Sequence, residues 1–235
     1  MNRLRALQLI KGGALVRPCL AATQVFAART LRFTAALQKE RDAGFLKRLS
    51  RRMGWLDHSR SILRMSGYLL YENVADKVDY ARFFKEFDMP DTFLSWFVIT
   101  ELHLWMLMVR MTAEGKEGEF VRNCMLNALW DDATVRAKKL EQGSPAGVRE
   151  QLNVLSEEFH ASLFGYDEGL LSGDRVLAGA LWRRFFQLQC RHPLHLESLV
   201  QFVRQQVKLL DGVTREEILL RPDIRWIAFQ KPSQM

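Results

Sequence analysis

One carboxylate and one histidine have the spacing of metal ligands on a helix. Glu157 and His160 form a Glu-x-x-His motif, which supplies two ligands in carboxylate di-iron proteins. A complete di-iron site needs a second copy of this motif and two further inward-facing glutamates. Glu101 and His103 cannot provide that copy, because residues two apart do not share one face of a helix. The sequence therefore predicts no metal site.

Two neighbouring aspartates suggest a second kind of site, one that binds a diphosphate through magnesium. Asp131 and Asp132 match the start of the aspartate-rich motif of all-α isoprenoid synthases, but Val135 stands where the third aspartate is needed. The sequence also lacks a Gly-x-Ser-x-Gly nucleophile elbow and a phosphate-binding loop. We therefore predict no catalytic residue, no cofactor and no enzymatic activity. The alternative is an all-α mitochondrial matrix enzyme, isoprenoid-synthase-like or metal-dependent.

The most apolar stretch, residues 93–109, carries Glu101 and His103 at its centre. It is shorter than the roughly 20 apolar residues of a membrane-spanning helix, and a carboxylate at mid-bilayer is costly. We therefore expect the buried central helix of a soluble bundle. Each of the two polar side chains must then find a partner, either on a neighbouring helix or in a groove that takes a partner helix.

Two tryptophans of the same stretch lie nine residues apart, at Trp96 and Trp105, and so project to opposite sides of a helix. One is expected to anchor the core, and the other to face a neighbouring element or a partner. Together with Glu101 and His103, these tryptophans are the candidate partner-binding residues.

Positive charge is concentrated at the N-terminus. The net charge is +7, and residues 1–39 hold seven lysines and arginines and no acid, so the remainder is neutral. An acid-free, Ala- and Leu-rich segment is typical of a mitochondrial import peptide, and Lys11 and Arg17 interrupt the apolar run that a secretory signal needs. We predict a mitochondrial transit peptide over residues 1–39, cut near Gln38–Lys39. A basic arm of the folded protein is the alternative.

A second group of cations follows this segment. Lys47, Arg48, Arg51 and Arg52 recur at helical spacing and form a basic stripe on one face. Such a stripe could rest on ribosomal RNA or on anionic lipid. A solvated helix face is the equally weighted alternative.

Residues 40–235 are expected to form a single compact all-α domain of about eight helices, since apolar residues recur at helical spacing throughout. Asp79 and the capping box Thr214–Glu217 are predicted helix starts. Glycines are predicted to break the chain at Gly115 and Gly118, ahead of a helix over 119–140.

Two boundaries are expected in the second half of the chain. The glycines at its ends predict a loop over residues 165–169. A helix containing Leu177 and Leu188 is expected to stop at His192–Pro193, because proline cannot continue a helix.

One long block carries a family resemblance. The segment Met89-Pro-Asp-Thr-Phe-Leu-Ser-Trp-Phe-Val-Ile-Thr-Glu-Leu-His-Leu-Trp-Met-Leu-Met-Val-Arg110 is similar to the ubiquinol–cytochrome c chaperone family. The resemblance continues through residues 113–118, 130–132 and 138–140, and covers roughly residues 56–210.

This resemblance implies a non-enzymatic assembly factor of respiratory complex III, with no catalytic residue to carry over. It implies that the chain pairs with a second small complex III assembly factor and acts near the mitochondrial ribosome. There it would bind newly made cytochrome b and support its translation and stability. The implied location is the matrix side of the mitochondrial inner membrane. The central apolar stretch predicts no transmembrane span and leaves peripheral membrane contact open.

Overall fold

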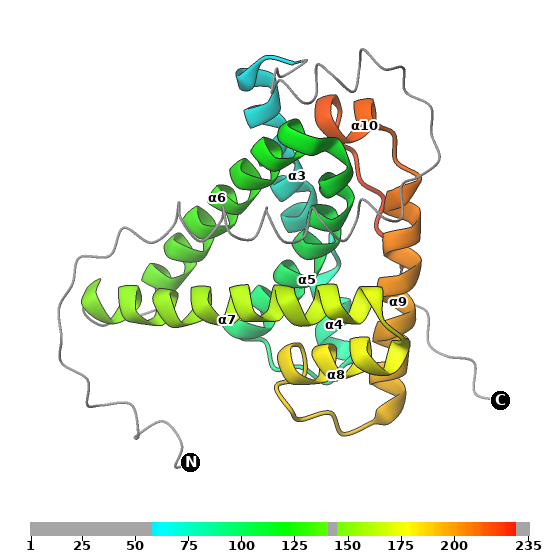
Figure 1. Ribbon diagram of the computed structural model, residues 1–235. Coiled ribbons are helices and arrows are strands. Elements are labelled where there is room, and N and C mark those ends of the chain that lie inside the picture. The colour runs from blue at the N-terminus through cyan, green and yellow to red at the C-terminus, as the bar shows by residue number, and fades with distance from the viewer. Residues whose placement is uncertain (1–57, 141–144, 229–235) are drawn as a thin grey trace. The chain divides into compact units, whose positions relative to one another are not determined.

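The computed structural model describes residues 58–140 and 145–228, and within these ranges every regular element is helical (Figure 1). The helices are α3 (Arg60–Lys77), α4 (Tyr80–Glu86), α5 (Phe93–Met111), the 3-10 turn η1 (Thr112–Glu114), α6 (Gly115–Leu140), α7 (Pro145–Leu171), α8 (Asp174–Arg184), α9 (Pro193–Asp211) and α10 (Arg215–Leu220). The all-α prediction is confirmed. The predicted transit peptide and the basic stripe lie outside the described residues.

Side-chain caps fix where several helices begin. Ser59, Asp79 and Thr92 each accept a hydrogen bond from a backbone N–H in the first turn of α3, α4 and α5. Thr214 and Glu217 form the predicted capping box of α10. The helix starts predicted at Asp79 and Thr214 are therefore confirmed, because each cap satisfies an N–H that has no partner inside its helix.

Helix α5 lies at the centre of the fold. It packs against α3, α4, α6 and α9, and α7 crosses in front of it (Figure 1). An 18-residue window within residues 93–140 has a mean hydropathy of 1.3. By length and composition alone, this stretch is long and apolar enough to cross a membrane. In this fold 78% of that window is buried. The predicted central core helix is therefore confirmed in the described fold.

Glycine breaks the chain at one of the two predicted positions between α5 and α6. Helix α6 begins at Gly115, whose φ of +60° favours glycine, and Gly118 lies inside its first turn. A Cβ on Gly118 would lie 2.1 Å from the carbonyl oxygen of Met111. The predicted break at Gly115 is confirmed, whereas Gly118 lies within the helix and the predicted helix start at residue 119 is wrong, because α6 begins at Gly115.

The predicted loop over residues 165–169 is also wrong, since α7 runs without interruption through both glycines. A Cβ on Gly169 would lie only 2.6 Å from the Cα of Leu177, so this glycine allows α8 to approach α7 closely. Helix α8 ends at Arg184, well before the predicted stop at His192 and Pro193. Pro193 is instead the first residue of α9.

Candidate functional site

Glu101, at the middle of α5, forms an ion pair that joins three helices. Its side chain is completely buried and accepts bonds from two N–H groups of Arg184 on α8, with Nη2 2.7 Å from Oε2 and Nε 3.0 Å from Oε1. Ser162 on α7 donates its hydroxyl to the same Oε1 atom at 2.7 Å. Arg184 also binds Glu158 of α7 at 2.7 Å. The predicted polar partner of Glu101 is therefore intramolecular.

The electrostatics of this pair follow from its burial. Burial would lower the pKa of the Arg184 guanidinium, but the hydrogen bonds and charge of Glu101 raise it above its usual value. Burial raises the pKa of Glu101, while Arg184 and Ser162 oppose that shift by binding the charged form. The two-pronged contact is the geometry of an ionised carboxylate with a guanidinium, so we treat the pair as charged.

A groove opens directly above this ion pair, between α7 and α8. Its volume is about 480 Å³, and Ser162 and Arg184 belong to its lining. Both helices contribute small residues to the groove lining, Ala161 and Gly165 from α7 and Ala180 from α8. Small side chains let a further helix approach closely. We call this feature the α7–α8 groove; Leu94, Glu158, Arg183, Gln187 and Leu188 complete its lining.

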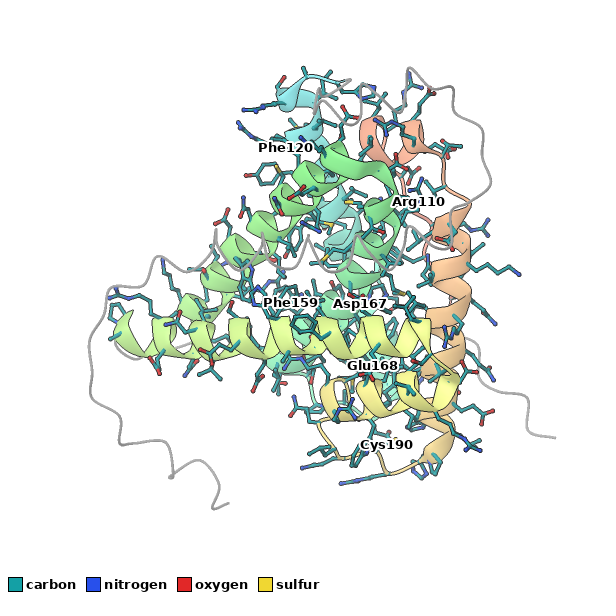
Figure 2. The ribbon with its side chains drawn as sticks, viewed as in Figure 1. Arg110, Phe120, Phe159, Asp167, Glu168 and Cys190 are labelled. Atoms are coloured by element: carbon teal, nitrogen blue, oxygen red, sulfur yellow. The ribbon has the colours of Figure 1, made fainter. Side chains whose placement is uncertain are left out.

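The loop between α8 and α9 forms one edge of the groove. Gln187 and Leu188 have φ values of 49° and 63°, a left-handed conformation that is uncommon for residues other than glycine. Leu188 is 57% exposed, so an apolar side chain is held out toward solvent. A second cavity of about 310 Å³ shares Leu94 and Gln187 with the groove and extends it toward the turn between α4 and α5. Cys190 lies in the same loop (Figure 2).

His103 faces a different side of α5, as its spacing from Glu101 predicts. It is completely buried and contacts the rings of Phe83, Phe202 and Trp226, with ring centroids 4.8–5.7 Å away. Its Nδ1 donates to the carbonyl oxygen of Ile99 at 2.7 Å, so Nε2 is unprotonated. Burial lowers the pKa of His103 to about 4, which keeps the imidazole neutral.

The two candidate tryptophans are both buried, at 8% and 1% exposure for Trp96 and Trp105. Trp96 lies against α6, where the guanidinium of Arg136 is 4.2 Å from its ring centroid. Trp105 donates its indole N–H to Asp167 of α7 at 2.8 Å. Figure 2 labels Asp167 along α7. Both tryptophans thus face neighbouring elements, and a partner-binding role for them and for Glu101 and His103 stays a prediction.

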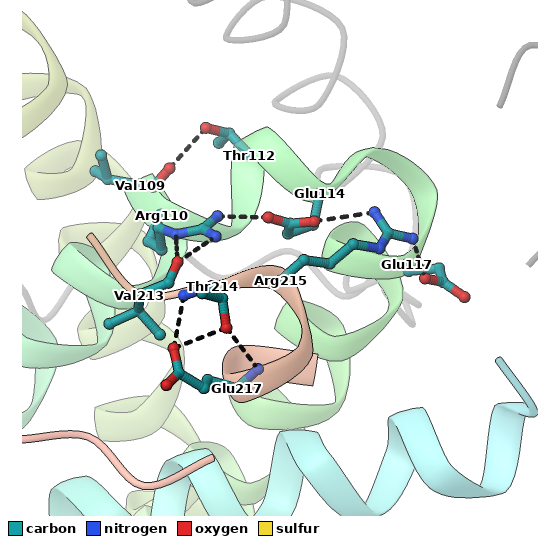
Figure 3. Close-up of polar contacts among 9 residues, drawn as sticks. All are labelled: Val109, Arg110, Thr112, Glu114, Glu117, Val213, Thr214, Arg215 and Glu217. Carbon is teal, nitrogen blue, oxygen red and sulfur yellow. Dashed lines mark hydrogen bonds and ion pairs between the residues drawn. The ribbon is translucent and has the colours of Figure 1, made fainter. Parts of the chain in front are cut away.

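A separate network of charges fastens the C-terminal helix α10 to the junction of α5 and α6 (Figure 3). Arg110 donates to Glu114 at 2.6 Å and to the carbonyl oxygen of Val213 at 2.8 Å. Arg215, the first residue of α10, binds both Glu114 and Glu117. Both glutamates are buried, so each needs these cations as partners.

The residues first examined as metal ligands have other contacts. The Nδ1 of His160 donates to the carbonyl oxygen of Ser156, four residues earlier on α7, at 2.6 Å. Asp132 accepts from the hydroxyl of Tyr71 at 2.6 Å and from Arg136 at 3.0 Å. In residues 58–140 and 145–228, no three His, Cys, Asp or Glu side chains are grouped so that they could hold a metal ion.

Helix α3 presents a second apolar surface. Its inner side packs on α6, with Gly67 allowing close approach to the backbone of Val121. Its outer side exposes four large side chains by 38–59%, at Ile62, Met65, Tyr68 and Leu69. We call these four residues the α3 face. Exposed apolar clusters of this kind are typical of protein or membrane contacts.

Sequence reasoning identified Glu101 but missed Arg184, Ser162 and Leu188. A charge at the centre of an apolar helix signals that a partner exists, because an unpaired buried charge is too costly. It does not say where along the chain that partner lies. No local signal marks Arg184, which is 83 residues away from Glu101.

Comparison with known proteins agrees with this fold. The sequence pattern of the family described as "Ubiquinol-cytochrome C chaperone" matches residues 85–225. The chain is 42% identical to ubiquinol-cytochrome c reductase complex assembly factor 1 of Drosophila melanogaster over 224 residues, which cover 93% of this chain and 86% of that protein. The Homo sapiens protein of the same name is 36% identical over 190 residues, which are 80% of this chain and 63% of the human protein.

A solved structure shows the same fold. The crystal structure of the Cbp3 homolog from Brucella abortus has a TM-score of 0.62 and 22% sequence identity, covering 79% of this chain and 98% of that one. Assembly by a chaperone is a non-enzymatic role, in agreement with the prediction that the chain is not an enzyme. With its family pattern matched over more than half of its length, the chain belongs to the ubiquinol–cytochrome c chaperone family.

Proposed function

We propose that this chain is a mitochondrial assembly factor of ubiquinol–cytochrome c reductase, respiratory complex III. The observation that carries the proposal is its 42% identity, over nearly the whole chain, to a protein named as an assembly factor of that complex. The acid-free, basic segment over residues 1–39 supports import into mitochondria. We place the mature protein on the matrix side of the inner membrane.

The client in this proposal is newly made cytochrome b, whose translation and stability the chain supports. Cytochrome b is a membrane protein, so before insertion its apolar helices need a surface that excludes water. The α7–α8 groove suits one such helix, because Ala161, Gly165 and Ala180 allow a close approach while Leu94 and Leu188 add apolar contact. Arg183, which is exposed at the same groove, can bind carbonyl oxygens or an acidic end of the client helix.

The candidate residues on α5 act in this proposal from beneath the surface. Glu101 holds Arg184 and Ser162 in the groove lining, and Trp105 fixes α7 through Asp167. Trp96 and His103 pack on two other sides of α5. They are positioning residues, and their substitution is expected to change groove geometry and stability together.

Further partners occupy other surfaces. The α3 face is separate from the α7–α8 groove, which would allow a second small assembly factor and the client to be held at the same time. The basic stripe, which precedes α3 in the sequence, would bind the mitochondrial ribosome or the anionic surface of the inner membrane.

The experiment that tests the client groove replaces Leu188 by asparagine in cells that lack the endogenous protein. Asparagine tolerates the left-handed backbone better than leucine, so the fold is expected to stay intact while the apolar groove edge is lost. We expect lower recovery of cytochrome b with the purified chain and less assembled complex III on native gels.

The matched control is Leu209→Asn, which changes a leucine with 50% exposure on α9 outside the groove lining. Normal complex III levels with Leu188→Asn would refute the groove as the client site. Normal complex III levels in cells that lack the chain altogether would refute the assembly function itself.

A further inference from the structure

The segment after α10, residues 222–228, has no regular secondary structure and lies against α9. Its main chain is held by Gln206 of α9, whose Oε1 accepts from the N–H of Ile227 at 2.9 Å and whose Nε2 donates to the carbonyl oxygen of Arg225 at 3.2 Å. These two backbone groups lie two residues apart, as in the pairing of a β-strand with its neighbour. The side-chain amide of Gln206 therefore hydrogen-bonds the backbone of the segment and not its side chains.

Gln206 has no other use in the described fold. Its side chain is completely buried, and its two hydrogen bonds both go to this segment. A buried amide without partners is costly, so the side of α9 that carries Gln206 requires an extended peptide next to it.

Three apolar side chains of the segment, Ile224, Trp226 and Ile227, are buried or partly buried, while Arg225 between them is exposed. Ile224 is 2% exposed, while Arg225 points to solvent. Trp226 enters an aromatic site, with its ring centroid 4.8 Å from that of His103 and its indole N–H donating to the carbonyl oxygen of Asn73 at 3.4 Å. The groove thus accepts the pattern apolar-x-aromatic-apolar in an extended conformation.

The segment does not fill this groove. A cavity of about 210 Å³ remains beside Trp226, between the start of α4 and the segment, with Phe83 and His103 in its lining. His103 also keeps an unused acceptor, because its Nε2 has no hydrogen-bond partner among residues 58–140 and 145–228. A ligand with a larger side chain or an additional N–H donor would therefore make contacts that the chain's own segment leaves unmade.

Several of the contacts that hold the segment are weak. Its ion pair between Asp223 and Lys77 is exposed, at 82% and 49%, and exposed pairs contribute little. The indole hydrogen bond of Trp226 is long, and Trp226 and Ile227 are only partly buried. The segment can therefore leave this site without the unfolding of any helix.

We propose that this groove, bounded by α3, α4 and α9, binds an extended segment of a partner protein with the pattern apolar-x-aromatic-apolar. The chain's own residues 224–228 are its intramolecular occupant, which the partner displaces. The tethering of the occupant gives it an effective concentration on the order of millimolar, so a free segment must compete against that value. The proposal concerns a different surface from the α7–α8 groove and does not depend on the assembly function.

The test measures binding of a fluorescein-labelled peptide with the sequence of residues 222–231 to the full-length protein, by fluorescence anisotropy. In the variant Ile227→Pro, the chain's own segment loses the N–H that donates to Gln206, whereas the peptide keeps it. Loss of this bond weakens the competitor, so we expect the peptide to bind the variant about tenfold more tightly than wild type.

The matched control is Ala228→Pro, because the N–H of Ala228 makes no hydrogen bond within the described ranges. Its peptide affinity should equal that of wild type. A peptide in which the isoleucine equivalent to Ile227 is N-methylated cannot donate to Gln206, and it should lose at least about tenfold in affinity for Ile227→Pro. This measurement changes the ligand alone, so it stays informative even if a Gln206 variant does not fold.

Three results would overturn the proposal. The first is absence of saturable binding to Ile227→Pro when its helical circular dichroism matches wild type. The second is unchanged affinity of the N-methylated peptide. The third is a concentration-dependent dimer of Ile227→Pro in light scattering without peptide binding, since the groove would then serve only this chain's own segment.

Discussion

The Glu101–Arg184 ion pair offers the sharpest test of the described structure. We consider Glu101→Leu, Arg184→Met and the double variant, because leucine and methionine keep the side-chain volume and remove only charge and hydrogen bonding. Arg184→Met leaves a completely buried carboxylate that keeps the hydroxyl of Ser162 as a donor but has lost its cation. Glu101→Leu leaves Arg184 with Glu158, whose side chain is 53% exposed.

The expected size of each effect follows from these contacts. Removing one partner of a buried ion pair costs about 3–5 kcal/mol, because the other charge stays desolvated. We expect Arg184→Met to be the more damaging single change, since Glu101 is 0% exposed and the side chain of Arg184 is 11% exposed. For a domain of this size such a loss lowers Tm by about 6–20 °C. The double variant should be no less stable than Arg184→Met, because no uncompensated charge remains.

The assay is thermal and urea unfolding of the four proteins, analysed as a double-mutant cycle. Arg183→Met is the matched control: this neighbouring arginine is exposed and should change stability by less than about 0.5 kcal/mol. The reasoning is refuted if Glu101→Leu is within about 1 kcal/mol of wild type. It is also refuted if the cost of the double variant equals the sum of the two single costs.

Three further predictions concern glycine packing, a buried histidine and the basic stripe. Gly169→Ala should destabilise the protein by about 1–3 kcal/mol in urea unfolding, because its Cβ would meet the backbone of Leu177, whereas Gly165→Ala, with 3.5 Å to the nearest atom, should be neutral or up to about 1 kcal/mol stabilising. The pKa of His103 is about 4 in the fold, so the unfolded chain binds a proton first as pH falls. The free energy of unfolding should therefore decrease by about 1.4 kcal/mol per pH unit between about pH 6.5 and 4. His103→Gln should remove this part of the pH dependence, and parallel stability curves for the two proteins would contradict the prediction. Serine at the three arginines of the basic stripe should reduce sedimentation with ribosomes or membranes and flatten its salt dependence, and an unchanged profile would make the stripe a solvated face.

Local features of the chain could be predicted where the physics is local. The caps at Asp79 and Thr214 satisfy N–H groups within three residues, so their meaning does not depend on the rest of the fold. Two glycine positions failed for the opposite reason. Gly118 and Gly169 were predicted as breaks because glycine favours turns, but each allows a close approach to another segment, which only the packed structure reveals.

The sequence by itself determined the all-α class, the buried central helix and the family, because helical periodicity and a long matching block are properties of consecutive residues. It also determined that Glu101 and His103 face different sides of that helix, since two residues turn a helix by roughly 200°. Tertiary structure alone decided what each of them meets. Glu101 joins Arg184 from 83 residues away beneath the α7–α8 groove, and His103 lies under Trp226, 123 positions later in the chain. Such pairings arise from how the helices pack on one another, and the distance between two residues along the sequence does not predict that packing.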